Sequence, residues 1–543
     1  MRTQVPPPSA PTDEQVRFCA EVIDASGVAE RLEQQLAPGT GRPRALSVQA
    51  LLVALLVLAL DERPLHLLAA TKLLFCQLSA ANRVLLGIVG EATTTLALLA
   101  CYRRVRYLFH RMCAIVDPSG EPKNRRLSPE RYEALRKEIG DEERARRQGM
   151  LEELVGDLVA ASVWVASEAE RSGFSGSVGL DATPVPLWSR GPSARTQRRA
   201  SDPDGGWYVR EGDHREGTGP NGKALRKLFW ALEATIVTMG RGPGEVPRHP
   251  NLVLGVVLGR PGEDPAGTGV RVLRWVRERG FSAGVLGADR GYTQGLPERF
   301  HLPVRAMGYS LVMDYKDGDL GRQANSQGAV MVDGAFYCPG MPEALVTAAA
   351  DRRAGRIDEA TFDERIAARA AWRLVKKEGP DAEGYERHSC PPQGDHPHLA
   401  CPLRTAAADK AVGRVPVLHP PTNPPKICTQ RSVTIAPDVG ARFRQDLVYG
   451  TEEWAATYAS YRNTIEGTNG YLKDPAHQAL AAPGRRRVRG IAAQSVFVAL
   501  LVMASNVRKI AAFRQLVADG AQQRVAQRAR RRRISLRDFQ PSG

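Results

Sequence analysis

Four short apolar segments rich in β-branched residues lie between positions 177 and 288, and they limit the possible folds more than any other feature. They are residues 177–183, 231–238, 252–258 and 283–288. Their length and composition are typical of strands. An amphipathic segment, 269–279, predicts a helix between the third and the fourth. We therefore predict a mixed α/β core in which helices flank the sheet.

The chain before this core has helical periodicity. Apolar residues recur at helical spacing in four segments, 16–32, 48–60, 96–113 and 151–165. Ser128-Pro129 is a typical helix start, because a capping residue precedes a proline at the first helical position. Residues 117–126 have the composition of a linker. We therefore predict an all-α N-terminal domain.

Beyond residue 303 the pattern is less regular, apart from a charged helical stretch at 342–377. Helical character returns at 454–473 and 491–513. The predicted organisation is a helical domain, a core interrupted by an insertion, and an Arg-rich tail. The proposed boundaries are 1–170, 171–302, 303–440, 441–515 and 516–543.

The net charge of the 543 residues is +16, which favours a polyanionic partner such as nucleic acid. An Arg-rich proteome or a basic tail would give the same charge without binding. The longest apolar run, 50–60, is too short to span a bilayer, and we interpret it as a buried helix. No secretory signal is visible. We expect a cytoplasmic protein.

Basic residues cluster in three places. A Gly-rich segment, 189–227, interleaves arginines with aromatics and suits a loop that follows a nucleic-acid backbone; a solvated surface loop is the alternative. Arg103, Arg104, Arg106 and His110 share one predicted helix, which is either a phosphate-binding or a solvated face. The tail includes four consecutive arginines, 530–533. The candidate DNA-binding residues in the Gly-rich segment are Arg198, Arg199, Trp207 and Arg210.

Three carboxylates follow the predicted strands and helices in an order that suits metal chemistry. Asp181 follows the first strand, Asp289 closes the fourth, and Glu466 lies on the helix at 454–473. Singly, each aspartate is a common turn former, and Glu466 could form a surface ion pair with Arg462, four residues earlier. Together they provide the hard oxygen ligands that Mg²⁺ prefers.

The segment from Gly287 to Tyr292 and the residues Arg462, Glu466 and Lys473 resemble the DDE transposases of bacterial insertion sequences. The likeness covers about residues 176–513. It is closest to the subgroup with a Tyr-Arg-Glu-Lys signature and an insertion before the catalytic Glu. The Tyr position of that signature is Ala459 here, flanked by Tyr458 and Tyr461.

This resemblance implies a ribonuclease-H-like core with an insertion between the fourth strand and the catalytic helix. It implies that Asp181, Asp289 and Glu466 bind two Mg²⁺ ions, with Mn²⁺ as a substitute, and that Arg462 and Lys473 hold DNA phosphates. The expected activity is strand cleavage at transposon ends and strand transfer, by at least a dimer on DNA in the nucleoid. The alternatives are a silent DNA-binding descendant, a nuclease without strand transfer, and a helical scaffold that binds RNA.

Four cysteines, Cys338, Cys390, Cys401 and Cys428, fall in the insertion, with His388, His396 and His398 near two of them. Zn²⁺ takes four such ligands and would stabilise a segment with little core. No tight Cys-x2-Cys pair is present, so unligated thiols are the alternative. The other four cysteines are expected in the helical core.

Overall fold

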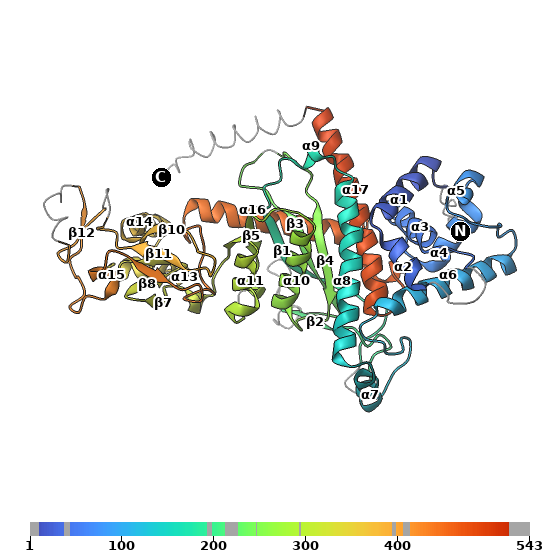
Figure 1. Cartoon of the computed structure of the whole chain (residues 1–543), viewed down its shortest axis with the longest axis horizontal. Coiled ribbons are helices and arrows are strands. Elements are labelled where there is room, and N and C mark those ends of the chain that lie inside the picture. The colour runs from blue at the N-terminus through green and yellow to red at the C-terminus, as the bar shows by residue number, and fades with distance from the viewer. Residues whose placement is uncertain are drawn as a thin grey trace, which may run out of the picture.

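The computed structural model describes residues 10–36, 44–192, 198–211, 226–245, 247–292, 295–393, 398–404 and 413–520. The molecule is elongated (Figure 1). The N-terminal helices occupy one end, a sheet with its own helices occupies the middle, and the segment between the last strand of this sheet and α16 (Glu452–Lys473) occupies the other end. The mixed α/β architecture and the helical N-terminal region are as predicted.

Helices make up the N-terminal region. They are α1 (Asp13–Ala25), α2 (Val28–Leu36), α3 (Val48–Leu60), α4 (Leu67–Lys72), the π-helical turn η1 (Leu73–Gln77), α5 (Ala80–Leu85), α6 (Thr95–Val116), α7 (Pro129–Ile139), α8 (Asp141–Trp164) and α9 (Glu168–Arg171). The predicted helix at 16–32 is wrong as a single element, because Gly27, at a φ of 65°, separates α1 from α2. The start of α7 is confirmed, since Ser128 accepts a hydrogen bond from the Arg131 amide.

The central sheet has the strand order β2-β3-β1-β5-β6, and β4 also pairs with β3. The strands are β1 (Val178–Pro186), β2 (Gly206–Glu211), β3 (Arg226–Met239), β4 (Val253–Gly259), β5 (Val285–Ala288) and β6 (Ser310–Val312). Strands β1 and β4 run antiparallel to β3, whereas β5 runs parallel to β1 and β6 parallel to β5. The prediction of a loop throughout 189–227 is wrong in part, because β2 and the start of β3 form a hairpin there.

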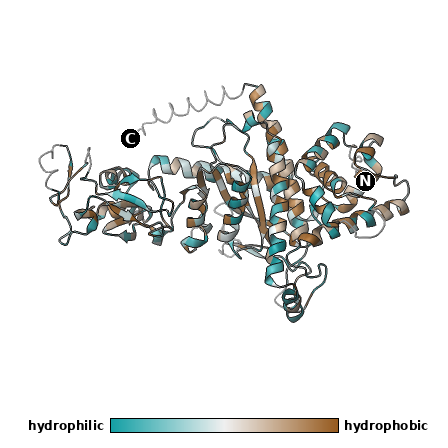
Figure 2. Cartoon of the chain, viewed as in Figure 1, coloured by the Kyte–Doolittle hydropathy of each residue, from teal (hydrophilic) through white to brown (hydrophobic). Residues whose placement is uncertain are grey.

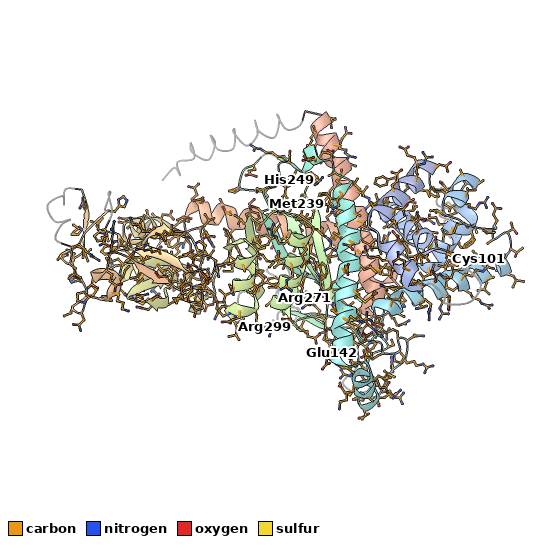
Figure 3. The ribbon with its side chains drawn as sticks, in the orientation of Figure 1. Cys101, Glu142, Met239, His249, Arg271 and Arg299 are labelled. Carbon is orange, nitrogen blue, oxygen red and sulfur yellow. The ribbon has the colours of Figure 1, made fainter. Side chains whose placement is uncertain are left out.

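Different helices cover the two faces of the sheet. Successive strand residues point to opposite faces. Leu180 faces α10 (Pro265–Glu278), where a Cβ on Gly269 would lie 3.2 Å from it. Gly179 faces α16 (Glu452–Lys473). Arg271 of α10, labelled in Figure 3, donates to Glu152 of α8 at 3.0 Å, so α10 is tied to the helical layer.

One apolar core joins the N-terminal helices to the sheet. It contains residues of α1 to α3, of α8, of β1, β3 and β4, and of α17 (Ile491–Ala518). Figure 2 shows this continuity as brown ribbon in α3, α17 and the strands. Helix α17 is long and apolar enough to cross a membrane, but 72% of its most apolar window is buried within the protein. Core packing accounts for its hydropathy.

Small sheets fill the segment between β6 and α16. One is β7 (Arg322–Ser326), β8 (Ala329–Val332) and β9 (Ala335–Tyr337), a second is β10 (Val375–Glu378), β11 (Glu386–Ser389) and β14 (Val433–Ile435), and a third is β12 (Leu399–Ala400) with β13 (Val415–Pro416). The helices of this segment are α12 (Glu343–Val346), α13 (Ala348–Arg353), α14 (Glu359–Arg369) and α15 (Lys426–Thr429), whereas α11 (His301–Ala306) precedes β6. The predicted helical stretch at 342–377 is wrong at its end, because β10 begins at Val375.

Candidate active site at the ends of β1 and β5

Asp181 and Asp289 are neighbours across two parallel strands. The last pair in the parallel register of β1 and β5 is Leu180 with Ala288. The next residue of each chain segment is an aspartate. Adjacent strands lie about 4.8 Å apart. The two carboxyl groups therefore lie side by side, just beyond the last residue pair of the two strands.

We expected strand β1 to end near Asp181. It continues to Pro186 instead. Beyond Leu180 it pairs only with β3, because β5 stops at Ala288. Pro184 and Pro186 lack the amide hydrogen of other residues, and this loss is tolerated on a strand with one free side. Asp181 therefore lies inside β1, at the point where β1 loses its parallel neighbour.

Helix α16 crosses this face of the sheet in close contact. A Cβ on Gly287 would lie 2.5 Å from Tyr461 Cβ, and one on Gly179 would lie 3.3 Å from Ile465 Cβ. Thr451 caps the helix by accepting a hydrogen bond from the Trp454 amide at 3.2 Å. The absence of side chains on two paired glycines thus lets the helix that carries Glu466 lie against β1 and β5.

Glu466 forms the ion pair that the sequence offered as an alternative. Arg462 Nε donates to Glu466 Oε1 at 2.9 Å, and the two side chains are 48% and 54% exposed. Arg462 also donates to the Tyr458 hydroxyl at 3.5 Å. The tyrosine that contacts this arginine is therefore Tyr458, one position before Ala459. Tyr461 instead lies over Gly287.

Electrostatic interactions connect the three acids. Burial raises the pKa of Asp181 from 3.8 to about 6, and the charges of Asp289 and Glu466 add to the rise. The amide of Ala182 and the Lys473 ammonium act in the opposite direction on this pKa. Lys473 thus acts electrostatically on Asp181.

Asn469 is a site residue that the sequence reasoning missed. Its amide nitrogen Nδ2 donates to Asp181 Oδ2 at 2.9 Å, and the residue is only 5% exposed. Ile465 lies over Gly179. Asn469 is one helical turn beyond Ile465, and Asp181 is two residues beyond Gly179 on the same face of β1. The register between helix and strand that brings Asn469 to Asp181 depends on the packing of Ile465 over Gly179, which the sequence alone does not show.

The turn after Asp289 is held by a buried aromatic residue. The Tyr292 amide donates to the Asp289 carbonyl at 3.0 Å. The Tyr292 ring is 3% exposed and packs against Phe300, with ring centroids 5.6 Å apart. Packing of the ring fixes the chain directly behind the second carboxylate.

Among the described residues, no three His, Cys, Asp or Glu side chains already stand as a metal-binding group. Within the candidate site Asp181 accepts a hydrogen bond from Asn469, and Glu466 accepts one from Arg462. The donor chemistry nevertheless suits Mg²⁺, which accepts two carboxylates and completes its shell with water.

The four other candidate DNA-binding residues differ in their surroundings. Arg198 is exposed. Arg199 lies over the Tyr132 ring at 4.5 Å and pairs with Glu133 at 3.6 Å, so α7 already engages it. Trp207 is 43% exposed and packs edge-on against Trp230. Arg210 lies on β2, with its side chain outside the described residues.

Two further basic regions lie on α6 and at the C-terminus. On α6, Arg103, Arg104, Arg106 and His110 are all exposed, which both readings of that helix allow. Residues 521–543 of the Arg-rich tail predicted at 516–543 lie outside the described residues, as do three basic residues of the Gly-rich segment 189–227, Arg195, Arg215 and Lys223.

The structure brings the four insertion cysteines together from four separate segments. All four are buried and free of disulfides. Cys390 and Cys338 share a hydrogen bond, which lowers the pKa of Cys338 and raises the pKa of Cys390. Burial raises the pKa of Cys401 and of Cys428, and the charge of Cys338 adds to both increases. His388 instead contacts Glu386 at 3.1 Å, and His396 lies outside the described residues.

The other four cysteines were expected in the helical core. Cys19, Cys101 and Cys113 are buried there, but Cys76 in η1 is exposed, which corrects that expectation.

No protein-family model, no curated protein and no solved structure matches the chain. A proposal about its function therefore rests on the geometry of its own residues.

Proposed function

We propose that the chain is a DDE-type DNA transposase with a ribonuclease-H-like core. The observation that carries this proposal is the register of β1 and β5, which sets Asp181 beside Asp289 under the helix that bears Glu466. The strand order β4-β3-β1-β5-β6, antiparallel in its first part and parallel in its second, agrees with the fold expected from the resemblance. The net charge of +16 favours DNA as the partner.

In this proposal Asp181 and Asp289 hold the metal ions, and Glu466 completes the site after it leaves Arg462. A pair of Mg²⁺ ions bound there would activate a water or a 3′-hydroxyl and stabilise the leaving oxygen. The residues around them position DNA: Arg462, released from Glu466, and Lys473 both neutralise phosphates.

Strand cleavage tests the proposal. The substrate is a plasmid that carries the DNA flanking the coding region, incubated with the full chain and Mg²⁺. We expect cleavage at the element's ends by the parent protein and loss of cleavage to background in Asp181→Ala, Asp289→Ala and Glu466→Ala. Glu453→Ala removes an exposed acid from the same helix and serves as the matched control. Asp181→Ala cutting as well as the parent would refute the assignment.

A joining assay separates the rival functions. A pre-cleaved end with a free 3′-hydroxyl is offered together with target DNA. The transposase proposal predicts joined product, whereas a nuclease of the same fold releases fragments and joins none. A silent descendant or an RNA-binding scaffold gives neither product.

We further propose that the protein acts as at least a dimer on DNA, in the bacterial cytoplasm at the nucleoid.

A further inference from the structure

Asn469 contacts Asp181 directly and is itself buried. Its Nδ2 donates to Asp181 Oδ2 at 2.9 Å. Its Oδ1 is buried and has no hydrogen-bond partner among the described residues. A buried amide oxygen without a partner costs free energy, so its presence next to a carboxylate calls for an explanation beyond packing.

The helix fixes the place of this amide. Ile465 lies over Gly179, and Asn469 is one turn further along α16. Asp181 is two residues beyond Gly179 on the same strand face. One turn of the helix therefore spans about the same distance as two residues of the strand. The close approach at Gly179 thus places Asn469 beside Asp181.

One oxygen of Asp181 is occupied by Asn469, which restricts rotation of the carboxylate about its Cβ–Cγ bond. Carboxylates that bind metals are commonly held in this way by a hydrogen bond from a neighbouring side chain, and loss of such a partner typically weakens metal binding about 10- to 100-fold. The Asn469 oxygen would accept a hydrogen bond from a water of the Mg²⁺ shell, because Mg²⁺ retains several waters.

We propose that Asn469 is a positioning residue that holds Asp181 in the orientation needed to bind a divalent metal. This inference rests on the proposed function, since it assumes that Asp181 is a metal ligand. Asn469 would be the fourth residue of the site, beside the three acids. Neither its charge nor its place in the chain indicated that it positions Asp181.

The test is metal affinity, measured without DNA and without turnover. Free Mn²⁺ is followed by its electron paramagnetic resonance signal during titration of the full chain. We expect about 10- to 100-fold weaker binding in Asn469→Ala and in the similarly sized Asn469→Leu. Asn463→Ala is the matched control, because Asn463 is an exposed asparagine on the same helix, and it should bind Mn²⁺ as the parent does. Thermal unfolding without metal checks that each variant is folded.

The outcomes separate the two claims. Asn469 variants that are folded and bind Mn²⁺ within about twofold of the parent, while Asp181→Ala loses binding, would overturn the part assigned to Asn469 and leave the proposed function intact. Asp181→Ala that binds Mn²⁺ as well as the parent would overturn both. Weak binding by both Asn469 variants, with Asn463→Ala unchanged, supports the inference.

Discussion

Gly179 and Gly287 are Cα partners in the parallel register of β1 and β5, and both lie directly under α16. This pair of residues determines how closely the helix approaches the sheet. The distance of the approach in turn determines whether Glu466 and Asn469 reach the two aspartates. The candidate site therefore depends on two residues that have no side chains of their own.

The first prediction concerns this contact. Gly287→Ala would place a Cβ 2.5 Å from Tyr461 Cβ, inside van der Waals contact. We expect a loss of about 1–3 kcal/mol in the free energy of unfolding, because the helix must shift. Gly470→Ala, on α16 with open space around it, should instead gain about 0.5–1 kcal/mol. Urea denaturation measures both, and a neutral Gly287→Ala would contradict the close approach.

Much of the fold could be predicted from the sequence. Helix α3 spans the predicted residues 48–60, because its apolar run begins after the cap Ser47 and ends at Asp61. The strands were found through their β-branched residues, although most boundaries moved. The β2–β3 hairpin was missed because β2 and the start of β3 are short apolar stretches within a segment, 189–227, that is polar and Gly-rich as a whole. The extension of β1 was missed because prolines usually argue against a strand.

The candidate site could be inferred from the sequence only in part. Asp181, Asp289 and Glu466 could be named from their positions in the chain, but the sequence could not show that Asp181 and Asp289 follow the last register pair of two neighbouring strands. Asn469 was missed because a helical asparagine carries no signal of its own. Only the packing of Ile465 over Gly179 shows which face of α16 meets the carboxylates.

The second prediction concerns pH. Burial raises the pKa of Asp181 from 3.8 to about 6 in the folded protein. The folded state then holds this proton at pH values where the unfolded state has lost it, so the stabilisation is full below about 4 and is lost as pH rises through about 6. Metal-free parent protein should lose stability relative to Asp181→Asn over that range, as measured by calorimetry. Curves that stay parallel would contradict the raised pKa.

The third prediction separates stability from DNA binding at Arg462. Its ion pair with Glu466 is half exposed, so Arg462→Ala should change the free energy of unfolding by less than about 1 kcal/mol. If Arg462 holds a phosphate, the same variant should reduce the slope of log affinity for DNA against log salt concentration by about one. Arg199→Ala serves as a comparison, since α7 engages that arginine. An unchanged salt slope in Arg462→Ala would exclude the phosphate contact.

The fourth prediction concerns the four buried cysteines of the insertion. We predict about one zinc ion per purified chain, because four thiols from separate segments provide a complete ligand set and metal binding would draw them closer. Elemental analysis of the parent, Cys390→Ser and Cys76→Ser measures this. Zinc should be lost in the first variant and retained in the second, whose thiol is exposed and remote in sequence. Parent protein with far less than stoichiometric zinc would favour unligated thiols.

The most direct measurement of the central claim is anomalous scattering from crystals of the full chain grown with Mn²⁺. A two-metal site predicts two peaks about 4 Å apart, both within bonding distance of the Asp181 and Asp289 carboxylates. Mn²⁺ bound only elsewhere, with neither aspartate contacting an ion at saturating concentration, would contradict it.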